Sequence, residues 1–141
     1  MKGIFLREGK IFSWILFCAR GKPFEVGMGN ITRCPWGSFE VLSEAPGHKV
    51  KRITVEPGGC LSLQLHHQRS EHWFVVAGSG VVTLEEKQKT LNTGDAIDIP
   101  RMARHRIRND SDTRLVFIEV QTGNYCGDDD IERLEDRYGR I

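Results

Sequence analysis

The sequence predicts an all-β fold, a sandwich or small barrel built by a single domain. From Arg33 onward, short apolar runs typical of strands recur at roughly 8–12-residue spacing, and turn residues separate them. The 141 residues include 15 glycines and 5 prolines, as a fold with many turns requires. No regular alternation of strands with helices is visible, which excludes a Rossmann-type fold.

Four strands are predicted in the first half of this region, each rich in β-branched, aromatic or aliphatic residues. Three of them stop at glycine, proline or polar residues, which favour the backbone angles of tight turns. The four runs are residues 50–55, before Pro57-Gly58-Gly59; 61–67; 73–77, before Gly78-Ser79-Gly80; and 81–85, before a polar hairpin at 86–89.

Four further strands and one helix are predicted toward the C-terminus. The strands are residues 89–91, before Asn92-Thr93-Gly94; 96–99, before Pro100; 105–108, before Asn109-Asp110-Ser111; and 114–121, before Gly123. A short C-terminal helix is predicted over residues 128–138, because Ile131, Leu134 and Tyr138 recur at helical spacing. Three aspartates lead this segment, where they suit a helix N-terminus.

Residues 1–28 differ from the rest and are predicted to be an N-terminal extension of a domain at residues 29–141. The apolar run at 11–19 is shorter than the about 20 residues that span a bilayer, and no small-x-small cleavage site follows it. We interpret the run as a strand or short amphipathic segment that covers apolar surface. These observations predict a cytoplasmic protein without a membrane span.

Charge and cysteine usage exclude further classes of protein. The 20 Lys and Arg residues nearly balance the 19 Asp and Glu residues, whereas binding to a nucleic-acid backbone needs a strong basic surplus. Cys18, Cys34, Cys60 and Cys126 form no C-x-x-C pair, so neither a zinc knuckle nor a redox pair is predicted. We expect free thiols in a reducing compartment.

The strand at 61–67 has one polar face. Successive side chains of a strand point to opposite faces. Ser62, Gln64 and His66 therefore share a face that is predicted to point into the barrel, and the leucines at 61, 63 and 65 are predicted to cover its outside.

Glu71 and His105 occupy comparable positions on two other strands. Glu71 is in phase with Trp73, and His105 is in phase with Ile107. A carboxylate on an inward apolar face is costly unless a charge or a metal pairs with it. Any one of these polar residues alone is more often a surface or capped group. Together, two imidazoles, one carboxylate and one amide oxygen predict the ligands of a divalent transition metal: Gln64, His66, Glu71 and His105.

The spacing of these residues resembles the two sequence motifs of the cupins. The motifs are Gly58-x5-Gln64-x-His66-x4-Glu71-x6-Gly78 and Gly94-x5-Pro100-x-Met102-x2-His105-x3-Asn109. Gln64 stands where many cupins have a histidine, and it resembles the Ser-x-Gln-x-His segment that supplies metal ligands in phosphomannose isomerases. Met102 stands where the second motif usually has glycine, so we expect a changed loop before His105.

Further segments resemble the type II mannose-6-phosphate isomerase domain, in matching order and spacing. They are residues 33–40, 49–53, 61–73 and 135–140. The resemblance implies a cupin barrel, that is, a double-stranded β-helix or jelly roll. It also implies metal-dependent interconversion of mannose 6-phosphate and fructose 6-phosphate through an enediol. Such domains are best known at the C-terminus of bifunctional enzymes, whose guanylyltransferase half has a Gly-rich nucleotide loop that this sequence lacks.

This reaction needs a Lewis acid, a base and groups that hold a phosphate. Zinc suits the predicted ligands best, with manganese and cobalt as alternatives. Glu119, in phase with Leu115 and Phe117, is the predicted base, and pairing of Glu119 with an arginine is the equal alternative. The predicted substrate-binding residues are Lys51, Ser62, Arg69 and Arg106, and Arg69 is also a candidate for proton transfer.

The remaining polar residues receive structural interpretations. His67 and His72 are out of phase with the ligands and are predicted to lie at the rim. A basic cluster is interpreted as a solvated strand edge: Arg101, Arg104, Arg106 and Arg108. Two other functions stay open: a cupin acting on another sugar phosphate or nucleotide sugar, and a non-catalytic sugar-binding cupin. The leucine face predicts a homodimer, with residues 1–28 as part of its cover.

Overall fold

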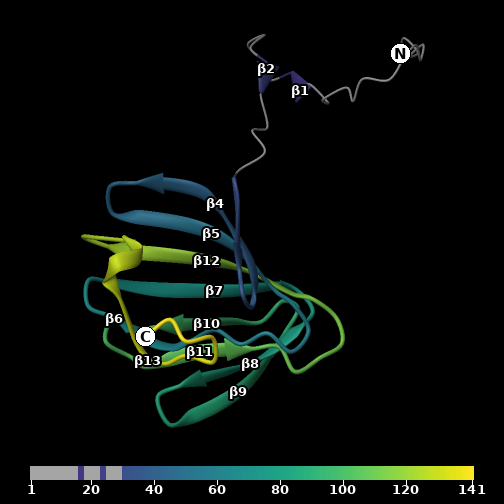
Figure 1. The fold of residues 1–141 in the computed structure, drawn as a ribbon. Helices are drawn as coiled ribbons and strands as arrows, with labels where there is room; N and C mark the ends of the chain where they lie inside the picture. The colour runs from purple at the N-terminus through teal and green to yellow at the C-terminus, as the bar shows by residue number, and fades with distance from the viewer. Residues whose placement is uncertain (1–15, 18–22, 25–29) are drawn as a thin grey trace, which may run out of the picture.

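The computed structural model describes residues 16–17, 23–24 and 30–141, and residues 31–135 form two antiparallel sheets (Figure 1). In spatial order, the six-stranded sheet consists of β10 (Ala96–Ile99), β7 (Arg69–Ala77), β12 (Leu115–Gly123), β5 (His48–Val55), β4 (Gly37–Ala45) and β3 (Ile31–Cys34). The five-stranded sheet consists of β13 (Ile131–Glu135), β6 (Leu63–His66), β11 (His105–Arg108), β8 (Ser79–Leu84) and β9 (Lys87–Asn92). The all-β prediction is confirmed.

All eight predicted strands are present, with bounds shifted by a few residues. Two further strands that were not predicted, β3 and β4, form a hairpin at the edge of the six-stranded sheet. The residues of β4 are only half-buried or exposed, so the strand lacks the apolar alternation by which strands are recognised. Its pairing with β5 holds it in the sheet.

The C-terminal helix predicted over residues 128–138 is wrong, apart from one 3-10 turn, η1 (Asp128–Asp130). Residues 131–135 form β13, which pairs with β6 in the register Ile131↔His66 and Arg133↔Gln64. Without β13, β6 would be an unpaired sheet edge with free backbone donors and acceptors. Pairing with that edge outweighs the local helical spacing, which is a weak determinant of structure.

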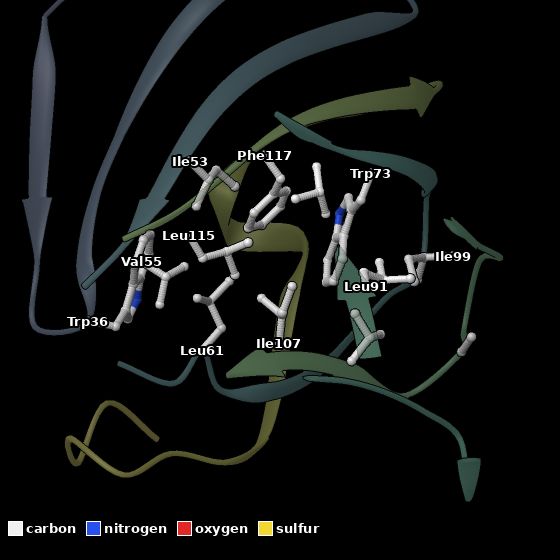
Figure 2. Close-up of a cluster of buried hydrophobic side chains, with 13 residues drawn as sticks. Trp36, Ile53, Val55, Leu61, Trp73, Leu91, Ile99, Ile107, Leu115 and Phe117 are labelled. Atoms are coloured by element: carbon white, nitrogen blue, oxygen red, sulfur yellow. The ribbon is translucent and has the colours of Figure 1, made fainter. Parts of the chain in front are cut away.

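The core lies between the two sheets (Figure 2). Trp36 and Val55 pack at one end of the cluster, Trp73 and Ile99 at the other, and Phe117 between them. The rings of Trp73 and Phe117 lie 5.1 Å apart between centroids. Both side chains are almost fully buried, and burial of a large apolar side chain contributes roughly 2 kcal/mol or more to stability.

Leu61 also belongs to this core, so its predicted place on the outer face is wrong. The predicted strand, with its alternation of inward and outward side chains, began two residues too early, because β6 begins only at Leu63. Leu63 and Leu65 are half-buried, whereas His66 on the opposite face is fully buried. The inward phase of His66 is therefore correct.

Little of the predicted extension is described. β1 (Leu16–Phe17) and β2 (Pro23–Phe24) pair with each other in a separate two-stranded sheet. Cys18 and most of residues 1–28 lie outside the described residues, and the boundary at residues 28/29 stays a prediction. The three described cysteines, Cys34, Cys60 and Cys126, are free thiols, as predicted. In the described part of the chain, no helix is long and apolar enough to cross a membrane.

Candidate metal centre

Three side chains from three strands converge inside the barrel. His66 ends β6, Glu71 lies near the start of β7, and His105 begins β11. None of them is more than 3% exposed. Nε2 of His66 lies 3.0 Å from Oε1 of Glu71, and Nε2 of His105 lies 3.7 Å from Oε2. One ligand atom from each of the three lies within 4.8 Å of the others, so the three side chains are placed to share one metal ion.

The hydrogen bonds of the two imidazoles fit a metal centre. Nδ1 of His105 donates to the carbonyl oxygen of Ala103 at 2.9 Å, and Nδ1 of His66 donates to that of Asp130 at 3.4 Å. These bonds turn both Nε2 atoms toward Glu71, the arrangement typical of metal-binding histidines. Nε2 of His105 is buried without a hydrogen-bond partner. A divalent cation would satisfy this atom.

Electrostatics keep Glu71 ionised. Burial alone would raise the pKa of this carboxyl. A hydrogen bond with His66 and the charges of His66, His105 and Arg69 outweigh burial and hold the pKa well below its usual range. Trp73 donates a further hydrogen bond from Nε1 to Oε2 at 3.0 Å. Burial also lowers the pKa of His105, which favours the neutral imidazole that a metal requires.

Gln64 lies beside this triad. It pairs with His105 across β6 and β11, so both side chains leave the sheet on the same face. Its Oε1 accepts a hydrogen bond from the hydroxyl of Ser62 at 2.8 Å. A carbonyl oxygen carries two lone pairs, so Oε1 keeps one for a metal. The role of Gln64 as fourth ligand stays a prediction.

Arg69 is buried against the triad rather than exposed at the rim. Its Nε donates to Oε1 of Glu71 at 3.0 Å, and its Nη2 lies 3.4 Å from Nε2 of His66. Its Nη1 donates to the carbonyl oxygen of Gly127 at 2.9 Å. The guanidinium therefore fixes the orientation of the Glu71 carboxylate and brings a positive charge to the site.

Glu119 is a second buried carboxyl in the same cavity. Burial and the neighbouring charge of Glu71 raise its pKa from 4.5 to about 8. Its Oε1 accepts a hydrogen bond from Nε2 of Gln121 at 2.7 Å, and Lys51 lies opposite it on β5. Among the described residues, no arginine lies within ion-pair distance of Glu119. The inward phase of Glu119 on β12 is confirmed, and its role as the base stays a prediction.

A cavity of about 120 Å³ connects these groups. Lys51, Ser62 and Arg69 line it together with Gln64, Glu71 and Glu119, as the sequence analysis expected. Arg106 lines a different cavity and pairs with Glu135 at 2.9 Å. Because Arg106 follows His105 on one strand, its side chain points to the opposite face. The predicted place of Arg106 in the substrate site is therefore wrong.

Four further polar residues that were not predicted line this cavity: Gln121, Asp128, Arg133 and Arg140. Gln121 shares the inward phase of Glu119 on β12, so alternation alone could have identified it. Asp128, Arg133 and Arg140 enter through the C-terminal segment, where the predicted helix concealed their direction.

The rim positions predicted for His67 and His72 are confirmed. The side chains of His67 and His72 are about half exposed and pair with Glu132 and Asp98. The interpretation of the arginine cluster as a strand edge is wrong, because Arg106 and Arg108 lie on β11, which β6 and β8 flank on both sides. The cluster is mostly paired with acidic groups: Arg104 with Glu85 and Glu86, Arg106 with Glu135, and Arg108 with Asp110. Arg101 instead donates to the carbonyl oxygen of His67.

Met102 has a left-handed backbone, with φ of 65°, and its side chain is 51% exposed. Residues other than glycine are strained in the left-handed region, which explains why the second cupin motif usually has glycine at this position. The backbone N–H of Met102 donates to the carbonyl oxygen of His66 at 2.9 Å. The loop before His105 therefore keeps a left-handed turn and links the two histidine segments.

Comparison with curated proteins gives relatives that are much longer than this chain. It is 50% identical over 106 residues to the alginate biosynthesis protein AlgA of Pseudomonas syringae pv. tomato. It is 45% identical over 106 residues to a mannose-1-phosphate guanylyltransferase of Klebsiella pneumoniae. In both cases the match covers 75% of this chain but only 22% of the relative, so the chain spans about a fifth of the length of these proteins.

The fold has a solved counterpart of similar size. A Klebsiella pneumoniae protein with a double-stranded β-helix domain superposes with a TM-score of 0.62 at 18% identity, over 79% of this chain and 90% of that one. This likeness supports the cupin fold implied by the sequence motifs. A family model described as "Mannose-6-phosphate isomerase C-terminal" matches residues 25–136, which is most of the chain. The chain therefore belongs to the mannose-6-phosphate isomerase C-terminal family.

Proposed function

We propose that this domain is a metal-dependent aldose–ketose isomerase that interconverts mannose 6-phosphate and fructose 6-phosphate. One observation supports this proposal above all. Glu71 of the His66–Glu71–His105 group, the carboxyl of Glu119 with a pKa of about 8, and several cations line one cavity. Moving a proton between C1 and C2 of a sugar needs an electrophile and a base at the same place.

Zinc is the proposed ion, held by His66, Glu71, His105 and Gln64, with manganese and cobalt as alternatives. When bound, the ion would act as a Lewis acid and stabilise negative charge that develops on the sugar oxygens. One carboxylate among three neutral ligands leaves the ion with a net positive charge. The buried guanidinium of Arg69 would hold the Glu71 carboxylate in place beside the ion.

Glu119 is the proposed proton-transfer residue. A pKa of about 8 allows the carboxyl both to accept and to return a proton near neutral pH. The hydrogen bond from Gln121 fixes its orientation. Lys51 and Ser62, which line the same cavity, are proposed to contact substrate oxygens. The enediol would thus form between Glu119 and the metal ligands.

A coupled assay for fructose 6-phosphate formed from mannose 6-phosphate tests the proposal. We expect turnover by the zinc-loaded protein, loss of turnover on chelation, and its return when zinc is added. Glu119→Gln should abolish turnover while zinc remains bound, because the amide cannot accept the proton. Glu44→Gln, an exposed substitution of the same kind, is the control. No turnover by metal-loaded protein would contradict the proposal, and turnover of another sugar phosphate would support the alternative substrate.

The oligomeric state and location are also proposals. Phe74 and Val76 are 43% and 45% exposed on the outer face of β7. Exposed apolar side chains on a sheet suit contact with a second copy, so we propose a homodimer. A light-scattering mass of 16.0 kDa rather than twice that value would contradict it. The free thiols of Cys34, Cys60 and Cys126 support a cytoplasmic location.

A further inference from the structure

Most cations of the cavity already have a carboxylate partner. Nζ of Lys51 lies 2.9 Å from Oδ1 of Asp128. Nε of Arg69 lies 3.0 Å from Oε1 of Glu71. The guanidinium of Arg140 is held by both carboxylate oxygens of Asp136. The charges of these three side chains are therefore balanced within the protein.

Arg133 is different. Its side chain lines the cavity from β13, and the residue is half-buried. Among the described residues, no carboxylate lies within ion-pair distance of its guanidinium, and its Nε is buried without a hydrogen-bond partner. A buried donor on a charged group is costly if nothing accepts from it. Within the described residues, the guanidinium is therefore a cation without an anionic partner, available to an anion that enters the cavity.

The strand register places Arg133 at a definite position relative to the metal ligands. Arg133 pairs with Gln64 across β13 and β6, and Gln64 pairs with His105 across β6 and β11. Directly paired residues point to the same face of a sheet, so the three side chains form a row on one face, and Gln64 and Arg133 of this row line the cavity. Two strand spacings separate the backbones of Arg133 and His105, which is about 10 Å. Arg133 thus lies at the other end of the row from the metal ligand.

We propose that Arg133 binds the phosphate group of the substrate. The planar fork of a guanidinium donates two parallel hydrogen bonds to phosphate oxygens, which gives both affinity and orientation. A phosphate held at Arg133 places the opposite end of a sugar chain toward His105 and Glu71. The inference deepens the proposed function, on which it rests for the identity of the phosphorylated sugar. It makes Arg133 the residue that selects a sugar phosphate over a free sugar.

Calorimetric titration tests this inference without using turnover. Mannose 6-phosphate, inorganic phosphate and mannose are titrated into the full zinc-loaded chain. Arg133→Gln should weaken binding of both phosphates by at least about 10-fold, since a hydrogen bond to a charged group is lost. Binding of mannose should not change. Arg133→Lys should fall between wild type and Arg133→Gln, because it keeps the charge but loses the fork.

Arg114→Gln is the matched control, since it removes the same charge from a side chain that is 69% exposed and pairs with Glu56. Equal phosphate affinity in wild type and Arg133→Gln would overturn the inference, as would an equal loss in Arg114→Gln or an absence of phosphate binding in wild type. If Arg133→Gln does not fold, unchanged affinity in Arg133→Lys would overturn it. Phosphate binding through Arg133 without isomerase turnover would contradict the proposed function alone.

Discussion

Replacing Glu119 by glutamine should stabilise the metal-free protein, by an amount that grows with pH. Glutamine is isosteric with glutamate and keeps an oxygen to accept the hydrogen bond from Gln121. It removes the ionisation of a carboxyl that lies almost fully buried beside Glu71. The substitution therefore isolates the free-energy cost of a buried negative charge.

The magnitude follows from the two pKa values. The pKa of Glu119 is about 8 in the folded protein, against 4.5 for an unperturbed glutamate. Below pH 4.5 the carboxyl is protonated in both states and does not affect stability through its charge. Above that pH the unfolded chain releases the proton while the folded protein retains it, so wild-type stability falls by about 1.4 kcal/mol per pH unit. The loss ends near pH 8, after about 4 to 5 kcal/mol.

Urea unfolding between pH 5 and pH 9, with chelator present, measures this effect. The free energy of unfolding of Glu119→Gln minus that of wild type should rise steadily up to about pH 8 and then level off. Glu44→Gln serves as the control, because Glu44 is exposed and its variant should parallel wild type. A difference between Glu119→Gln and wild type that is flat over this range would refute the raised pKa and, with it, the reason for choosing Glu119 as the base.

Two further predictions concern the metal ligands and the loop that precedes His105. His105→Ala should lose bound zinc, because it removes one of three converging ligands. Elemental analysis after dialysis measures the loss, and His72→Ala, a substitution of an exposed histidine, should retain the zinc. Retention of a full equivalent of zinc by His105→Ala would contradict the ligand assignment. Met102→Gly should raise the free energy of unfolding in urea by about 1 kcal/mol, since it relieves a left-handed backbone at a side chain that is half exposed. A lower stability of Met102→Gly would show that the methionine side chain contributes packing that outweighs the strain.

Strand alternation predicted the metal centre because its ligands lie on the most regular part of the fold. Glu71 shares its inward face with Trp73, and His105 shares its face with Ile107, so buried neighbours identified the direction of each polar side chain. Two predicted positions are wrong. Leu61 precedes the strand to which it was assigned, and Arg106, named as a substrate-binding residue, has a phase that opposes that of His105.

The N-terminal hairpin could not be predicted for a different reason. β3 and β4 carry few buried apolar residues, so their local sequence has no strong period. They are held in the sheet by pairing with β5, which is a contact between segments rather than a property of either one. Strand propensity depends strongly on such context.

The wrong helix and the missed cavity position of Arg133 have one physical cause. In a helix, Ile131, Leu134 and Tyr138 would form an apolar stripe. In the observed strand, Ile131 and Arg133 face the cavity and Leu134 is exposed. The change of period from 3.6 to 2 is what turns Arg133 inward. That change depends on the free edge of β6, the strand that carries Gln64 and His66. β6, which carries two predicted metal ligands, therefore also pairs with the segment that carries the unpaired Arg133. The local sequence of β13 does not show that β6 has a free edge, and the local sequence of β6 does not show which segment pairs with that edge.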